Sequence, residues 1–202
     1  MQNQLPFEAV SMDDSPSPDP RLPKLIYWGR IFQEFGLAPS YGTGSHGNLS
    51  IRSKDGCLIT ATQTFLAMLK EKHFVEIVNC DLKVSPPVVR YRGTSSPSTD
   101  SLIHWHMYQW RPEVTCVMHG HDPLALTYAQ QLGIPKTSWA ADAGSPELVE
   151  LIRPLAHHAY FLIRDHGFVA VGQTVEEVGE LAMSVYTQAA ALAHHGRPKR
   201  KK

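Results

Sequence analysis

Three histidines give this sequence its clearest chemical signal. His119 and His121 flank Gly120 directly after the apolar run at residues 114–118. Because side chains two apart in a strand point to the same side, this pair can offer two imidazoles to one metal ion. His166 follows a second apolar stretch and would complete a site that fixes a catalytic zinc ion while leaving a position open for a substrate oxygen. The alternative interpretation is that all three are polar residues at strand ends or in loops.

The residues around these histidines form four blocks. The first reads S-H-G-N-L-S-I-R at 45–52, the second L-I-T-A-T at 58–62, and the fourth R-D-H-G at 164–167. The third begins with S-P-S-T-D at 96–100, continues through His104, Tyr108 and R-P at 111–112, and ends at H-G-H. In type and order they resemble the class II aldolase/adducin family, over about residues 25 to 190. The resemblance implies an α/β protein with a single-domain, layered α/β/α fold and a central, largely antiparallel sheet. It also implies that His119, His121 and His166 bind Zn²⁺, although ligand type alone admits another divalent transition metal.

Asp100 stands where aldolases of this family carry a proton-shuttling glutamate, and the resemblance therefore implies that it is catalytic. The family's ribulose-phosphate 4-epimerases resemble this chain here with S-S-D. A carboxylate beside a dication tends to stay ionised, so Asp100 can act as a base or as a fourth ligand. The alternative is that it is an acidic residue in the first turn of a helix, where the helix dipole favours negative charge.

The resemblance also implies a pocket for a substrate phosphate. Hydrogen-bond donors at the matching positions are Asn48, Thr62, Ser98 and Thr99. A helix that begins near Ser98 would add free backbone N–H groups. Gln63 replaces the family's glycine and puts a side chain where the backbone should approach the phosphate. For Asn48 and Thr62, turn formation is the competing explanation.

Two further departures concern the general acid. The family's aldolases carry a catalytic tyrosine in a longer loop, which a neighbouring subunit supplies, but residues 136–144 of this chain contain no tyrosine. The family's tyrosine-bearing C-terminal tail is also replaced, by the basic run at 197–202. The remaining candidates for a proton donor are Asp142, His104, His106 and Tyr108, of which His104 and Tyr108 fit better as residues that pack a helix.

From the resemblance we expect a metal-dependent, aldolase-type lyase that acts on a small sugar phosphate or hydroxycarbonyl compound through a metal-stabilised enediolate. The same chemistry serves a sugar-phosphate 4-epimerase or a methylthioribulose-phosphate dehydratase-like enzyme. A non-catalytic, adducin-like binding module is the alternative from another class, but such members lose the histidines that this chain keeps. The resemblance further implies a homotetramer with its site at the subunit interface.

Composition sets broader limits. The chain has 202 residues with zero formal net charge, so only the basic C-terminal run favours nucleic acid, and we expect no such partner. No apolar stretch reaches the length of a membrane helix, and the N-terminus lacks a secretory pattern. Cys57, Cys80 and Cys116 are scattered and odd in number, which is typical of reduced thiols. We therefore expect a soluble, cytoplasmic protein that does not bind membranes.

The elements that must position the site follow from periodicity. Residues 1–20, rich in proline and aspartate, are expected to be disordered, 21–195 to form the domain, and 196–202 to be a basic tail. We expect helices over about 22–35, from Ser98 to Trp110, from Ser145, and from a capping box at 174–177. Strands are expected over about 47–53, 56–60, 75–79 and 84–91, before the H-G-H pair, and over 159–171 with His166 inside.

Overall fold

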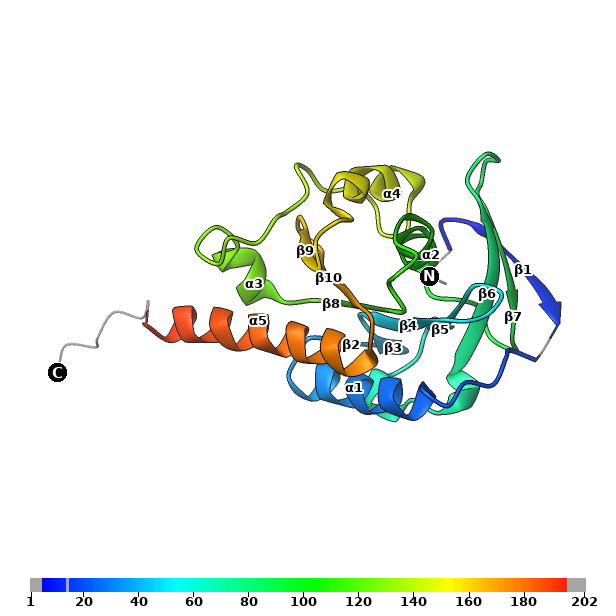
Figure 1. The fold of residues 1–202 in the computed structure, drawn as a ribbon, viewed down its shortest axis with the longest axis horizontal. Coiled ribbons are helices and arrows are strands. Elements are labelled where there is room, and N and C mark those ends of the chain that lie inside the picture. The colour runs from blue at the N-terminus through cyan, green and yellow to red at the C-terminus, as the bar shows by residue number, and fades with distance from the viewer. Residues whose placement is uncertain (1–4, 14, 196–202) are drawn as a thin grey trace.

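The computed structural model describes residues 5–13 and 15–195 (Figure 1). Its helices and strands, apart from three short 3₁₀ turns, are β1 Glu8–Asp13, α1 Leu22–Glu34, β2 Ser40–Tyr41, β3 Gly44–Ser45, β4 Asn48–Arg52, β5 Cys57–Thr60, β6 Phe74–Asp81, β7 Val88–Arg92, α2 Ser101–Trp110, β8 Cys116–Gly120, α3 Pro123–Tyr128, α4 Pro146–Ile152, β9 Tyr160–Ile163, β10 Gly167–Gly172 and α5 Val175–His195. The expected basic tail at 196–202 lies outside the described residues.

One eight-stranded sheet organises the domain. Its strand order is β1-β7-β6-β5-β4-β8-β10-β9, and every neighbouring pair is antiparallel except β1 and β7. Helices α1, α3 and α5 cover one face, and α2 and α4 cover the other (Figure 1). The expected layered α/β/α fold with a largely antiparallel sheet is therefore confirmed.

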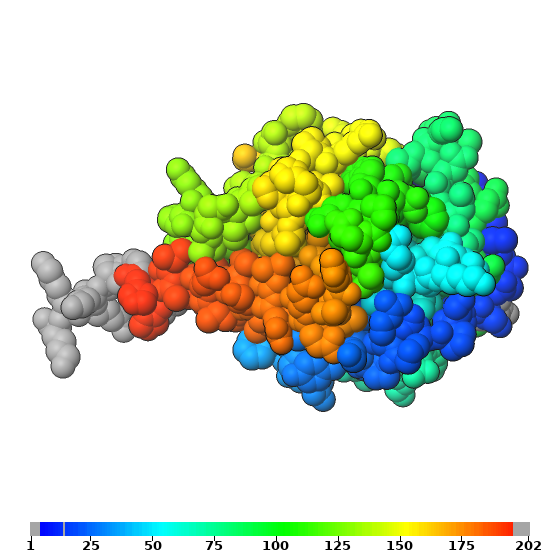
Figure 2. Space-filling model, viewed as in Figure 1, coloured from blue at the N-terminus to red at the C-terminus, as the bar shows by residue number. Residues whose placement is uncertain are grey.

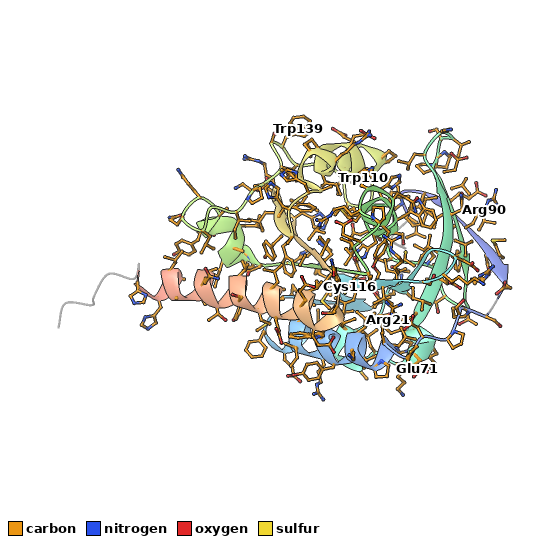
Figure 3. The ribbon with its side chains drawn as sticks, viewed as in Figure 1. Arg21, Glu71, Arg90, Trp110, Cys116 and Trp139 are labelled. Atoms are coloured by element: carbon orange, nitrogen blue, oxygen red, sulfur yellow. The ribbon has the colours of Figure 1, made fainter. Side chains whose placement is uncertain are left out.

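Alternation along the central strands sends side chains into two separate cores. On β4, Leu49 and Ile51 are fully buried in the core beneath α1 and α5, which lie side by side on the surface in Figure 2. On β8, Cys116 belongs to the same core and is placed centrally in Figure 3, whereas Val117 belongs to the core under α2 and α4. Strands that are buried on both faces explain why their sequences read as apolar runs.

Several expected boundaries are confirmed. Helix α1 ends before Gly36, which has a φ of +79° and so takes the left-handed conformation of a helix C-terminus. The hydroxyl of Ser145 accepts a hydrogen bond from the N–H of Leu148 at the start of α4. At α5 one half of the expected capping box is present, because the Thr174 hydroxyl accepts a hydrogen bond from the N–H of Glu177. The Glu177 carboxylate accepts instead from the N–H of Gln173, at 2.9 Å, which lies outside the expected box.

The expectation of disorder over residues 1–20 is wrong at residues 7–13. Residues Glu8–Asp13 form β1, which pairs in parallel with β7 at the edge of the sheet. The side chain of Phe7, directly before β1, is 4% exposed in the core under α2. Partners far along the chain thus supply the backbone hydrogen bonds that local composition does not predict.

Two other boundaries are also corrected. The expected single strand over 159–171 is a hairpin of β9 and β10, with His166 in the turn after Asp165, whose φ is +57°. Helix α2 begins at Ser101 with Asp100 at its N-cap position, so Ser98 is not the cap. Ser98 instead accepts a hydrogen bond through its carbonyl from the Ser101 hydroxyl. None of the helices built from residues 5–13 and 15–195 is long and apolar enough to span a membrane.

Candidate active site

The three histidines predicted as metal ligands come together at one end of the central strands. His119 lies near the end of β8, His121 follows that strand, and His166 lies in the β9–β10 turn. Their ring centroids are 5.2 Å (His119 to His121), 4.8 Å (His119 to His166) and 5.0 Å (His121 to His166) apart. One nitrogen from each ring lies within 4.8 Å of the others, which is a spacing that one metal ion can bridge.

Hydrogen bonding and burial prepare His119 to bind a metal. A ring nitrogen, Nδ1, lies 2.7 Å from the carbonyl oxygen of Phe168, to which it donates when it carries the proton. That leaves Nε2 fully buried and without a hydrogen-bond partner among the described residues. Burial, and next the neighbouring His166, hold the pKa of His119 well below its usual value, so its imidazole is neutral. A neutral ring with a free, oriented lone pair is what a metal site requires.

Glycines allow the backbone to approach this cluster closely. Gly47 has a φ of +83°, and a Cβ there would lie 2.8 Å from the carbonyl oxygen of His119. A Cβ on Gly167 would lie 2.1 Å from the carbonyl oxygen of Gly120. Gly47 of H-G-N and Gly167 of D-H-G therefore allow the close packing of the turns beside the histidines.

The carboxylate of Asp100 lies beside the histidine cluster. Its Oδ2 is 3.7 Å from Nε2 of His119 and accepts a hydrogen bond from the side-chain amide of Asn48 at 2.8 Å. Although Asp100 occupies the N-cap position of α2, its side chain caps no backbone N–H there. Oδ1 is buried with no partner among the described residues. The carboxylate is thus available for chemistry at the cluster.

Two further pairs of residues extend this contact between β4 and α2. We call the contacts of Asn48, Ser50 and Arg52 with Asp100, His104 and Tyr108 the polar ladder. The Ser50 hydroxyl lies 2.6 Å from Nδ1 of His104 and 2.8 Å from the hydroxyl of Tyr108. The guanidinium of Arg52 stacks 4.9 Å from the Tyr108 ring and donates to the Tyr108 carbonyl oxygen. His104 and Tyr108 are therefore buried residues that pack the helix, as the sequence suggested, and they hold the strand and helix that carry Asn48 and Asp100.

A pocket of about 230 Å³ opens onto these groups. The structure brings the predicted binding residues together in its wall, where Asn48, Thr62, Ser98 and Thr99 lie with Asp100 and with two of the histidines, His121 and His166. Of the described residues that line it, none is lysine or arginine. Negative charge on a ligand would therefore meet hydroxyl and amide donors, and a bound cation, instead of basic side chains.

The chain matches a model described as "Class II Aldolase and Adducin N-terminal domain" over residues 24–193. It belongs to the class II aldolase and adducin family. Class II aldolases are metal-dependent, and the histidine cluster of this member could bind a metal.

Relatives over most of the chain are enzymes. The methylthioribulose-1-phosphate dehydratase of Pseudoalteromonas translucida is 28% identical over 185 residues, which cover 77% of this chain and 82% of that protein. The 5-methylthioribulose-1-phosphate/5-deoxyribulose-1-phosphate aldolase of Rhodospirillum rubrum is 30% identical over 159 residues, 70% of this chain and 68% of that one. In fold, the chain is similar to the L-fuculose-1-phosphate aldolase of Thermus thermophilus, with a TM-score of 0.68, 20% identity, and 87% and 96% of the two chains covered.

Gln63, which stands where the resemblance implies a glycine, takes a backbone conformation that glycine favours. Its φ is +55°, in the left-handed region. The residue is exposed and lines the pocket beside Thr62 and Thr64. A non-glycine residue costs about 1–2 kcal/mol in this conformation, so the loop holds Gln63 there against its intrinsic preference.

Two ring-bearing side chains that line the pocket, those of His46 and Tyr41, were not predicted from the sequence. His46 packs its ring 4.6 Å from that of His121, and Tyr41 packs 4.9 Å from His46. The position of His46 directly before G-N-L-S was the available signal, whereas nothing local marked Tyr41. Of the other proton-donor candidates, His106 lies against the carbonyl of Leu102 within α2, and neither it nor Asp142 lines the pocket.

Proposed function

We propose that this chain is a metal-dependent, aldolase-type lyase that acts on a small hydroxycarbonyl compound, with or without a phosphate. The observation that carries the proposal is the cluster of His119, His121 and His166 beside the buried carboxylate of Asp100. The unpartnered Nε2 of His119 and the all-imidazole donor set fit a zinc ion, which these three residues would hold. Zinc supplies a Lewis acid for the negative charge that develops on a substrate carbonyl oxygen when a neighbouring carbon–carbon bond breaks or forms.

The chain's own residues supply the remaining functions. Asp100 moves a proton at the carbon next to the carbonyl, and the amide of Asn48 holds its Oδ2 in place through the 2.8 Å hydrogen bond. Thr62, Ser98 and Thr99 offer hydroxyl groups to the far end of the substrate. We assign Asn48 to binding as well as to positioning, because it also lines the pocket.

A dehydratase is the second candidate. The 28% identity to a methylthioribulose-1-phosphate dehydratase supports it, because elimination of water also begins with removal of a proton next to a polarised carbonyl. A 4-epimerase would use the same groups for cleavage and re-addition. An adducin-like binding module would not need the three converging imidazoles.

We also propose that the chain forms a homotetramer and is cytoplasmic. The family resemblance supports the tetramer, and the three unpaired cysteines support a reducing compartment. Light scattering should give about four times the chain mass of 22.5 kDa, and a mass of one chain would refute the assembly.

The metal content of untagged protein tests the central proposal. Plasma mass spectrometry should find close to one zinc per chain, and the His119→Ala and His166→Ala variants should lose it. His157→Ala is the matched control, because His157 is exposed and lies outside the cluster, and it should keep the metal. Protein that contains no metal and takes up no added zinc would favour the binding module.

A further inference from the structure

Aldol chemistry requires proton transfer at two places. One proton leaves or joins the carbon next to the ketone, and another joins or leaves the oxygen of the aldehyde partner. A single carboxylate positioned at one of these atoms does not serve both in the same step. The proposed function, on which this inference rests, assigns the first proton to Asp100, so a second group must handle the other.

Among the described residues that line the pocket, Tyr41 is the only one with a phenol side chain. It is half-buried, and its ring packs at 58° and 4.9 Å against the ring of His46. The His46 ring in turn lies 4.6 Å from that of His121, at 31°. These three rings form a continuous row from the wall of the pocket to the histidine cluster. Other neutral hydroxyl groups in the wall belong to serine and threonine, which are far weaker acids than a phenol.

The hairpin that carries Tyr41 is fixed on several sides. Tyr41 in β2 pairs with Gly44 in β3. A Cβ on Gly44 would lie 2.9 Å from the backbone nitrogen of Thr64, so the hairpin packs tightly against the loop at 62–64. Ser45 bonds to that loop through its N–H to the Thr64 carbonyl at 3.1 Å, and its hydroxyl accepts from the N–H of Leu66 at 3.0 Å. The phenol therefore sits on a braced element instead of a free loop.

We propose that Tyr41 is the second proton-transfer group of the site, supplied by the same chain as the histidines. In the direction of bond formation, Asp100 takes a proton from the carbon next to the ketone. The electron pair released there forms the new bond to the aldehyde carbon, and the aldehyde oxygen takes the proton of the Tyr41 hydroxyl. The proton on Asp100 then returns to Tyr41 through solvent, so both groups are restored and no oxidant or reductant is needed. Cleavage runs through the same steps in reverse.

Tyr41→Phe tests this proposal, because it removes one oxygen and leaves the ring that packs on His46. Two reactions of zinc-loaded protein are compared. The first is exchange of the α-protons of dihydroxyacetone phosphate and of dihydroxyacetone with deuterium oxide, followed by NMR, which needs Asp100 but no aldehyde. The second is condensation of the same ketones with glyceraldehyde. Tyr27→Phe is the matched control, since Tyr27 is an exposed tyrosine on α1 outside the pocket.

We expect Tyr41→Phe to keep exchange within about 3-fold of the wild type and to lose at least about 100-fold in kcat for condensation, with little change in KM. Asp100→Asn should lose both reactions, and Tyr27→Phe neither. Condensation by Tyr41→Phe within about 3-fold of the wild type would overturn the proposal. Equal loss of exchange and condensation would overturn it too, because it would assign Tyr41 a structural role. Absence of exchange by the wild type would instead refute the proposed function itself, and this inference with it.

Discussion

Replacing His104 by glutamine tests whether the polar ladder contains a neutral histidine. His104 is fully buried, its Nδ1 lies 2.6 Å from the Ser50 hydroxyl, and its Nε2 has no partner among the described residues. Burial lowers the pKa of His104 to about 4, although the nearby charge of Asp100 acts in the opposite direction. In the unfolded chain the pKa of this residue is about 6.5, so below that pH unfolding takes up a proton that the folded state does not bind.

The sign and size of the effect follow from these two pKa values. Stability contributed by neutral His104 is complete above about pH 6.5 and is lost as the pH falls from there toward 4. At pH 4.5 the loss amounts to about 2.5 kcal/mol. Glutamine is similar in size, can bond to Ser50 and does not titrate. We therefore expect the wild type to lose about 2.5 kcal/mol more stability than His104→Gln between pH 7.5 and 4.5.

Urea unfolding of metal-free protein in EDTA, at steps between pH 7.5 and 4.5, measures this difference. Removing the metal prevents its own release at low pH from contributing. His157→Gln, a change at an exposed histidine, should follow the wild-type profile at every pH. If the profiles of the wild type and His104→Gln run parallel, His104 is not held neutral by burial, and the reasoning is refuted.

Three further substitutions have defined outcomes. Gly47→Ala should cost more than about 2 kcal/mol in urea unfolding and weaken zinc binding in a chelator competition, because its Cβ would meet the His119 carbonyl at 2.8 Å with φ at +83°. Arg52→Lys should cost about 2–3 kcal/mol by the same unfolding assay, since one ammonium cannot replace the guanidinium that bonds to three carbonyl oxygens and stacks on Tyr108. Gln63→Gly should leave stability within about 1 kcal/mol of the wild type or raise it, because glycine adopts a φ of +55° without strain. The same substitution removes a side chain from the pocket, so calorimetry should show tighter binding of dihydroxyacetone phosphate relative to dihydroxyacetone.

The sequence predicted the histidine cluster because strand spacing placed His119 beside His121 and the family resemblance added His166. The spacing of His119 and His121 needs only a strand, and His166 reaches them because β10 pairs with β8 in the sheet. The error at His166 was local. The run at 159–171 read as one strand, since only three polar residues interrupt it and the reversal depends on Asp165 at a positive φ, which no glycine signals.

Features set by distant partners were not predictable in the same way. All six residues of β1 are half-buried or exposed, so their pattern resembles an unstructured polar segment. The strand forms because β7 offers a free edge. Tyr41 and His46 enter the pocket through the β2–β3 hairpin, whose strands have only two residues each. Such short elements leave no periodicity in the sequence, and their position depends on the loop at 62–64 that lies against them.

In the polar ladder, every second residue of a strand meets every fourth residue of a helix, and this match holds one carboxylate in place. Two residues of a strand advance about 6.7 Å, and four residues of a helix advance about 6.0 Å, so a strand and a helix that run side by side stay in step for about three pairs. By the third pair the helix lags by about 1.4 Å, and Tyr108 indeed contacts both Ser50 through its hydroxyl and Arg52 through its ring. The first pair contains Asp100 and joins it to Asn48. Asn48 on β4 bonds to Asp100 and is also the register partner of His119 on β8. The helix therefore brings the carboxylate, and the sheet brings the buried imidazole, to the same residue of β4.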